Sequence, residues 1–160
     1  MFQSVNEINE FNFEDCVITG FHLHKGTIVL QLESLIVMPR NSQNTNYTES
    51  YADTATLELL KGQITEYVKE GYKLYDANDK LLKEVPDEPL CLADFSEFVK
   101  KCTDAYLYEI EQIDNRIYLL YLEFPGEDEY DITGRTNYRL KIQADSAIIS
   151  WERYLNRVQR

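Results

Sequence analysis

The 160-residue chain is poor in the residue types on which most recognisable sites depend, with six glycines, three cysteines and two histidines. No G-x-G-x-x-G or Walker A loop is present to hold a phosphate, and no serine has the flanking glycines of a G-x-S-x-G nucleophile motif. Cys16, Cys91 and Cys102 form no C-x-x-C pair and are odd in number, which indicates reduced thiols. The sequence therefore offers no catalytic signature of these classes.

Long apolar runs are also missing. No stretch approaches the roughly 20 residues that cross a bilayer as a helix. The opening residues, MFQSVNEINE, lack a basic start followed by an apolar run. Together with the reduced thiols, this pattern predicts a cytoplasmic protein that does not bind a membrane.

Basic residues are outnumbered, with 16 Lys and Arg against 28 Asp and Glu, which gives a net charge of −12. Binding to nucleic acid without sequence preference needs a basic face that replaces counterions, so this balance argues against such a partner. Twelve tyrosines and seven phenylalanines are too many for a disordered acidic tail. We expect one globular domain over residues 1–160.

What is abundant is alternation of apolar and polar residues with a period of two, the pattern of half-buried antiparallel strands. Turn signals such as Lys25-Gly26, Lys61-Gly62 and Asp114-Asn115 lie between apolar runs and suggest hairpins. The predicted fold is mainly β, an antiparallel meander that forms a barrel or sandwich of about nine strands. The runs cover 16–23, 28–38, 54–60, 64–69, 72–75, 81–85, 105–113, 116–124, 136–143 and 147–154.

One helix is predicted near residues 94–102. Asp94 can cap its first turn, Glu97 completes a capping-box-like pair, and Phe95, Phe98, Val99 and Cys102 share one face. Residues 2–13 fit a short helix and an irregular arm equally well. The polar stretch 40–53 is predicted to be a mobile surface loop.

The acidic hairpin 104–124 can be placed more closely. With Asp114-Asn115 as a two-residue turn, Tyr108 lies opposite Tyr121 and Leu107 opposite Leu122. Both faces of this hairpin are mainly apolar, which predicts central strands that are covered on both sides.

His22 and His24 are the only candidates for a metal site built on histidine. Residues two apart on a strand project from one face, so both imidazoles could bind one ion. A turn at Lys25-Gly26 places Val29 and Thr27 opposite them and leaves no third ligand nearby. We therefore predict two histidines without a metal, and no cofactor.

Charge and tyrosine content point to a binding surface instead. The segment 104–131 holds nine acids and one base, whereas 132–160 holds six bases and two acids. If the last two strands pair with the acidic hairpin, cross-strand ion pairs explain this asymmetry, and an acidic face that docks a basic protein is the functional alternative. The candidate binding residues are Tyr106, Tyr108, Tyr118, Tyr121, Glu123, Glu127, Asp128 and Glu129.

The leading hypothesis is a non-enzymatic protein that binds a basic protein partner through this acidic, tyrosine-rich face. In size, charge and composition the chain resembles many small bacterial proteins, and it is similar to the small acidic immunity proteins that neutralise toxin enzymes. That resemblance implies an inhibitor-like role. Two alternatives remain open, a β-barrel that holds a small molecule near Tyr106, Tyr108, Tyr118 and Tyr121, and a metal-dependent enzyme that uses His22 and His24. The sequence leaves the oligomeric state open.

Overall fold

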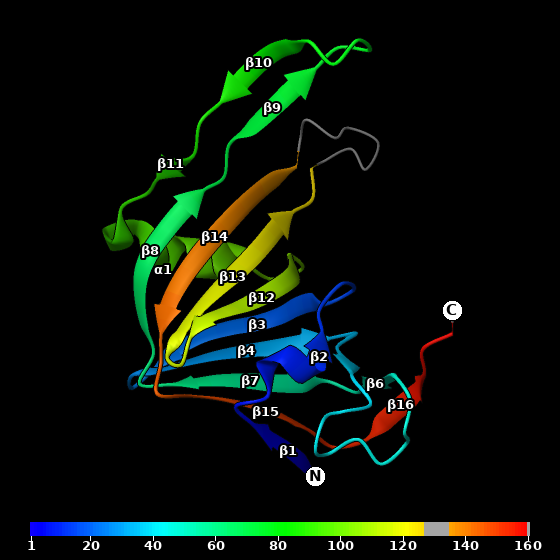
Figure 1. The fold of residues 1–160 in the computed structure, drawn as a ribbon. Coiled ribbons are helices and arrows are strands. Elements are labelled where there is room, and N and C mark those ends of the chain that lie inside the picture. Colours follow the sequence, from blue (N-terminus) through cyan, green and yellow to red (C-terminus); the bar gives the residue numbers. More distant parts are fainter. Residues whose placement is uncertain (127–134, 160) are drawn as a thin grey trace.

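The computed structural model describes residues 1–126 and 135–159, which form antiparallel sheets with one short α-helix (Figure 1). The predicted mainly β fold with a helix near 94–102 is confirmed. The strands are β1 (Phe2–Val5), β2 (Phe11–Asn12), β3 (Val17–His24), β4 (Thr27–Glu33), β5 (Ile36–Val37), β6 (Ser50–Ala52), β7 (Ala55–Leu60), β8 (Gln63–Lys69), β9 (Tyr72–Tyr75), β10 (Leu81–Val85), β11 (Glu88–Pro89), β12 (Tyr106–Asp114), β13 (Ile117–Phe124), β14 (Thr136–Gln143), β15 (Ser146–Trp151) and β16 (Tyr154–Arg157). The helices are the 3₁₀ turns η1 (Ile8–Glu10) and η2 (Leu92–Asp94) and the α-helix α1 (Phe95–Lys101). Among the described residues, no helix is long and apolar enough to cross a membrane.

The main sheet has ten strands in the order β1-β15-β7-β4-β3-β12-β13-β14-β8-β11. Over the described residues it stays open, because β1 and β11 are its two edges and do not pair with each other. The turn at Lys61-Gly62 is therefore not a hairpin, contrary to the prediction. It links β7 to β8, which are separated in the sheet by five other strands.

This long-range link is possible because the strands converge at one end and diverge at the other (Figure 1). At the convergent end, neighbouring turns are bonded through their backbones. Gly62 N–H donates to Gly26 O at 2.7 Å, and Asp145 N–H donates to Leu60 O at 2.8 Å. The Asp145 carboxylate also lies 3.7 Å from Lys61 Nζ and 3.9 Å from Arg116 Nη1.

Two predicted strands are each broken in two. The run 28–38 ends at Glu33, because Ser34 takes a positive φ of 62° that turns the chain, and β5 then joins a second sheet. The run 147–154 breaks between β15, which ends at Trp151, and β16, which begins at Tyr154. The second sheet has the order β16-β6-β5-β2. The Trp151 ring joins the two sheets, since it lies 5.6 Å from the ring of Phe2 and 5.8 Å from that of Phe11.

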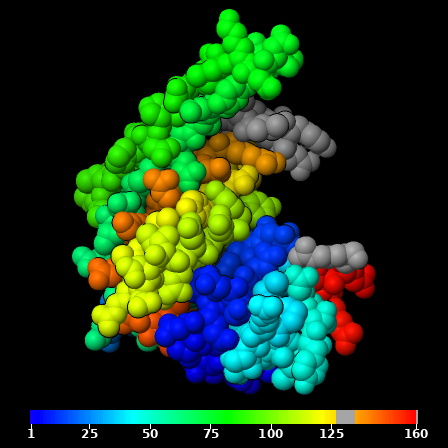
Figure 2. All heavy atoms as spheres, viewed as in Figure 1, coloured from blue at the N-terminus to red at the C-terminus, as the bar shows by residue number. Residues whose placement is uncertain are grey.

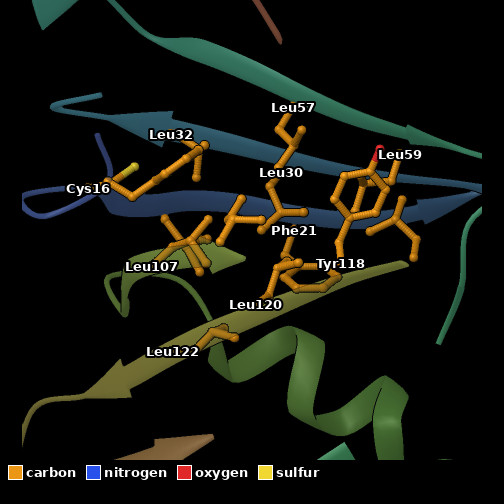
Figure 3. Packing of buried hydrophobic residues seen from close by; sticks show 14 of the residues in the cluster. Cys16, Phe21, Leu30, Leu32, Leu57, Leu59, Leu107, Tyr118, Leu120 and Leu122 are labelled. Carbon is orange, nitrogen blue, oxygen red and sulfur yellow. The ribbon is translucent and has the colours of Figure 1, made fainter. Parts of the chain in front are cut away.

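The core lies on the concave side of the main sheet, where side chains of β3, β4, β7, β12 and β13 interdigitate (Figure 3). Helix α1 packs on this side through Phe95 and Phe98, both only 5% exposed. Phe98 touches four aromatic rings, with centroids 4.7 Å away for Tyr67 and 4.9 Å away for Tyr138. The helix thus covers apolar surface that the diverging strands alone would leave open.

The predicted capping box of α1 does not form. Asp94 occupies the N-cap position, but its side chain makes no capping hydrogen bond. The 3₁₀ turn η2 runs directly into α1, and the backbone N–H of Phe95 already bonds to Leu92 O. A helix that starts from such a turn has one fewer donor left for a side chain to satisfy.

The register of the β12–β13 hairpin matches the prediction only at its open end. Leu107 lies opposite Leu122 as expected, but Glu109 rather than Tyr108 is the partner of Tyr121. A bulge between Leu107 and Glu109 inserts one residue, and the tight turn follows Asp114 instead of including it. A bulge of this kind changes which way a side chain points, so it alters the outer face of the hairpin.

The polar segment 40–53, predicted to be a mobile surface loop, contains buried side chains. Asn41, Asn44 and Ser50 are all less than 9% exposed. Asn44 Nδ2 donates to three backbone carbonyls, those of Val37, Met38 and Thr48, at 2.9 to 3.1 Å. Hydrogen bonds from one amide side chain thus take the place of the regular β-ladder hydrogen bonds that this segment lacks.

We expect Asn44→Ala to lower the free energy of unfolding by about 2–4 kcal/mol, since it removes the donor of one buried and two part-buried hydrogen bonds to backbone carbonyls. Urea unfolding followed by circular dichroism measures this change. Asn78→Ala, on an exposed turn, is the matched control and should stay within about 0.5 kcal/mol of the parent. Equal effects of the two substitutions would contradict the structural role of Asn44.

Candidate functional site

The convex face of β12, β13 and β14 gathers three of the four candidate tyrosines. Tyr108 and Tyr121 lie in contact, with ring centroids 6.1 Å apart. The Tyr121 hydroxyl donates to Glu111 Oε2 at 3.2 Å, and Tyr106 is 41% exposed. Tyr118 is separate from them, since it is fully buried among the core side chains (Figure 3). The structure therefore does not place all four tyrosines around one cavity.

Two adjoining pockets lie at the divergent end of this face, and together we call them the tyrosine cleft. The first, of about 370 Å³, lies between β9 and the ends of β13 and β14, and its lining includes Glu70, Tyr72, Leu74 and Asn137. The second, of about 680 Å³, is lined by Tyr106, Tyr108, Glu14, Pro125 and neighbours. Glu123 and Arg135 line both pockets, and their charged groups lie 3.3 Å apart.

The cleft forms where a β ladder splits. β8 pairs with β14 as far as Lys69 and Tyr138, and one further bond follows, from Glu70 N–H to Asn137 O at 2.8 Å. At Gly71 the chain leaves β14 and enters β9. Glu70 and Asn137 are thus cross-strand neighbours at the fork, where both line the first pocket.

The Glu70 side chain places an unsatisfied hydrogen-bond acceptor in this fork. Its Oε1 atom is buried and has no hydrogen-bond partner among the described residues, and the same holds for Oδ1 of Asn137. Burial raises the pKa of Glu70 above its ordinary value, and the carboxylate of Asp87 adds to that effect while Arg139 opposes it. A buried carboxylate oxygen without a donor costs free energy that a hydrogen-bond donor arriving from outside would recover.

Tyr108 stays a neutral donor beside these acids. Burial, followed by the negative charges of Glu70 and Glu123, raises the pKa of the Tyr108 hydroxyl to about 12. Burial and the bond to Glu111 raise the pKa of Tyr121 as well. The cleft therefore combines carboxylates that attract a cation with tyrosine rings and hydroxyls that contact it.

The predicted cross-strand ion pairs account for only part of the acidic hairpin. Glu123 pairs with Arg135, but Arg139 and Lys141 of β14 turn to Asp87 and Glu66 on the β8 side. Glu109 and Glu111 form no ion pair with any described residue and are exposed. The convex face near the cleft therefore keeps negative charge that the basic strand does not neutralise.

Three predicted binding residues, Glu127, Asp128 and Glu129, lie outside the described residues. His22 and His24 are both exposed, and the turn at Lys25-Gly26 pairs them with Val29 and Thr27 as predicted. Over residues 1–126 and 135–159, no group of three His, Cys, Asp or Glu side chains is arranged to hold a metal ion.

The sequence did not predict three residues of the cleft, Glu70, Asn137 and Tyr72. Their signal is weak, since Glu70 and Gly71 look like an ordinary gap between two predicted strands. The glycine is the informative residue, because a Cβ there would lie 1.9 Å from Val85 O, so only glycine fits where the chain leaves the sheet. That the Oε1 atom of the adjacent glutamate is buried depends on long-range pairing, which no local pattern reveals.

Comparison with known protein families, curated protein sequences and solved structures gave no match to this chain.

Proposed function

We propose that this chain is a non-enzymatic binding protein that takes a basic protein partner into the tyrosine cleft. The observation that carries the proposal is the buried Glu70 Oε1, which lacks a donor among the described residues at a fork lined by tyrosine and glutamate. A lysine or arginine side chain would supply that donor together with the opposite charge. Tyrosine is enriched at protein interfaces because its ring offers area and its hydroxyl a polar contact.

The charge of the whole chain supports the same partner. At −12, it attracts a basic protein over a distance and repels an acidic one. The segment 127–134 adds four acids and no base to the sequence between two cleft residues, Gly126 and Arg135. An inhibitor of the immunity-protein kind would use its charge in this way.

The proposal needs no cofactor. The three free thiols fit a reducing compartment, so the cytoplasm is the proposed location.

A labelled ten-residue peptide of alternating lysine and serine tests the proposal by fluorescence anisotropy at low salt. We expect binding that weakens as salt is added, and Glu123→Gln should weaken it about fivefold because it removes one cleft charge and frees Arg135. The control is Glu152→Gln, which removes the same charge from an exposed residue between β15 and β16.

Nonspecific attraction to an acidic protein would be weakened equally by the two substitutions. Equal effects, or no binding of the lysine peptide by the parent protein, would therefore contradict the proposal.

A further inference from the structure

The hairpin of β9 and β10 projects from the body of the protein as an arm (Figures 1 and 2). Its two strands pair only with each other among the described residues. All but one of their residues are exposed, and the exception, Val85, is half-buried. A two-stranded hairpin with both faces in water is marginally stable at best, so this arm requires an explanation beyond its own packing.

The base of the arm is fixed. Gly71 lies so close to Val85 O that no side chain fits, and Gly71 N–H donates to the Asp87 carboxylate at 2.7 Å. Asp87 in turn lies 3.6 Å from Arg139 on β14. The arm is therefore held at a set place beside the tyrosine cleft by contacts that link it to the main sheet.

The arm exposes large apolar side chains. Tyr72 and Leu74, which are 45% and 40% exposed, line the first pocket opposite Glu123 and Asn137. Tyr75, Leu81 and Leu82 add further apolar surface nearby. The Tyr72 ring already attracts a cation, since Lys83 Nζ lies 5.7 Å from its centroid. The arm thus lines the pocket with Tyr72, Leu74 and one base, Lys73, and the other side carries two acids, Glu70 and Glu123, with Asn137 and Arg135.

We infer that the arm and the sheet together bind an amphipathic basic segment of the partner protein, in which a lysine or arginine is flanked by apolar side chains. The inference rests on the proposed function and adds the partner's apolar component. The partner's lysine or arginine side chain points to Glu70 and Glu123, while the apolar side chains that flank it cover Tyr72 and Leu74. A second copy of this chain fits poorly, because two surfaces of a protein with a charge of −12 repel each other.

The test compares two labelled peptides that carry the same five lysines. The first alternates lysine with serine, and in the second, leucine replaces three of the serines. We expect the leucine-containing peptide to bind the parent protein about tenfold more tightly, because it buries apolar surface on the arm. Leu74→Ser should abolish most of that preference, measured as the ratio of the two peptide affinities.

Matched variants separate this effect from unfolding of the arm. Leu155→Ser changes the same residue type on β16, at the other end of the molecule, and should keep the preference (Figure 1). Leu74→Met keeps an apolar side chain and should also keep it. Far-ultraviolet circular dichroism confirms that each variant is folded.

The outcomes distinguish the proposed function from the role of the arm. If neither peptide binds the parent, the proposed function fails. If both bind equally well, or if Leu74→Ser and Leu155→Ser act alike, the basic partner stands and the role of the arm is overturned. Sedimentation of the parent and of Leu74→Ser completes the test, because a parent dimer that the substitution dissociates would assign the arm to self-association and overturn the inference.

Discussion

Phe98→Ala is expected to lower the free energy of unfolding by about 3–5 kcal/mol, the largest effect of any single substitution we consider. Phe98 is 5% exposed and contacts the rings of Tyr67, Phe95, Phe124 and Tyr138. Its removal leaves a cavity between α1 and the sheet at the place where the strands diverge. Neighbouring rings held by four different elements cannot all move in to fill that cavity.

Denaturant unfolding followed by both far- and near-ultraviolet circular dichroism measures this effect. Leu92→Ala, on the exposed turn η2 just before the helix, is the control and should change the free energy by less than about 1 kcal/mol. If Phe98→Ala cost no more than Leu92→Ala, α1 would not be packed on the sheet as described.

The local pattern of apolar and polar residues was sufficient to predict most helices and strands of this fold. Alternation placed the strands β3, β7, β9 and β10 to within a residue or two, and the one-sided apolar spacing of 95, 98 and 102 placed the helix. The Lys25-Gly26 turn was also correct, because both residues take the positive φ that a two-residue hairpin requires.

Sheet order could not be predicted in the same way. A turn such as Lys61-Gly62 shows that the chain reverses, but it does not show that β7 pairs with β15 and β4 while β8 pairs with β14 and β11. Those partners are distant in sequence. The bulge at Tyr108 is a similar case, since nothing local marks the extra residue that shifts the β12–β13 register.

The candidate site was predicted only in part for the same reason. Four of the candidate residues lie near one another because they belong to one hairpin, namely Tyr106, Tyr108, Tyr121 and Glu123. A hairpin can be predicted from local sequence. Glu70 and Tyr72 join them only because β8 pairs with β14 and then departs from it at Gly71. A half-buried acid at such a fork is a product of sheet order.

Glu70→Gln provides the sharpest test of that acid, because we expect it to stabilise the free protein at pH 7 while weakening its binding. A glutamine amide at this position can donate to Asn137 Oδ1, which is buried without a described partner, and carries no charge to desolvate. The expected gain in the free energy of unfolding is about 1–2 kcal/mol. Affinity for the lysine–serine peptide should fall about tenfold, since the acceptor for its ammonium group loses its charge. Residues retained at a cost to stability are typical of binding sites.

The pH dependence of this gain follows from the raised pKa of Glu70, whose ordinary value is 4.5. The folded protein holds this proton more tightly than the unfolded chain does, so the stability of the parent falls as pH rises through the raised pKa. The glutamine variant does not titrate at this position. Its advantage over the parent should therefore be smallest below pH 4.5, grow as the pH rises, and level off once Glu70 is ionised in the folded state. Thermal unfolding of both proteins between pH 4 and 8 measures the difference, with Glu109→Gln on the exposed part of β12 as a control for the loss of one surface charge. A stabilised variant that binds the peptide as well as the parent does would place the binding site elsewhere, and an advantage that shrinks with rising pH would show that Glu70 is not desolvated.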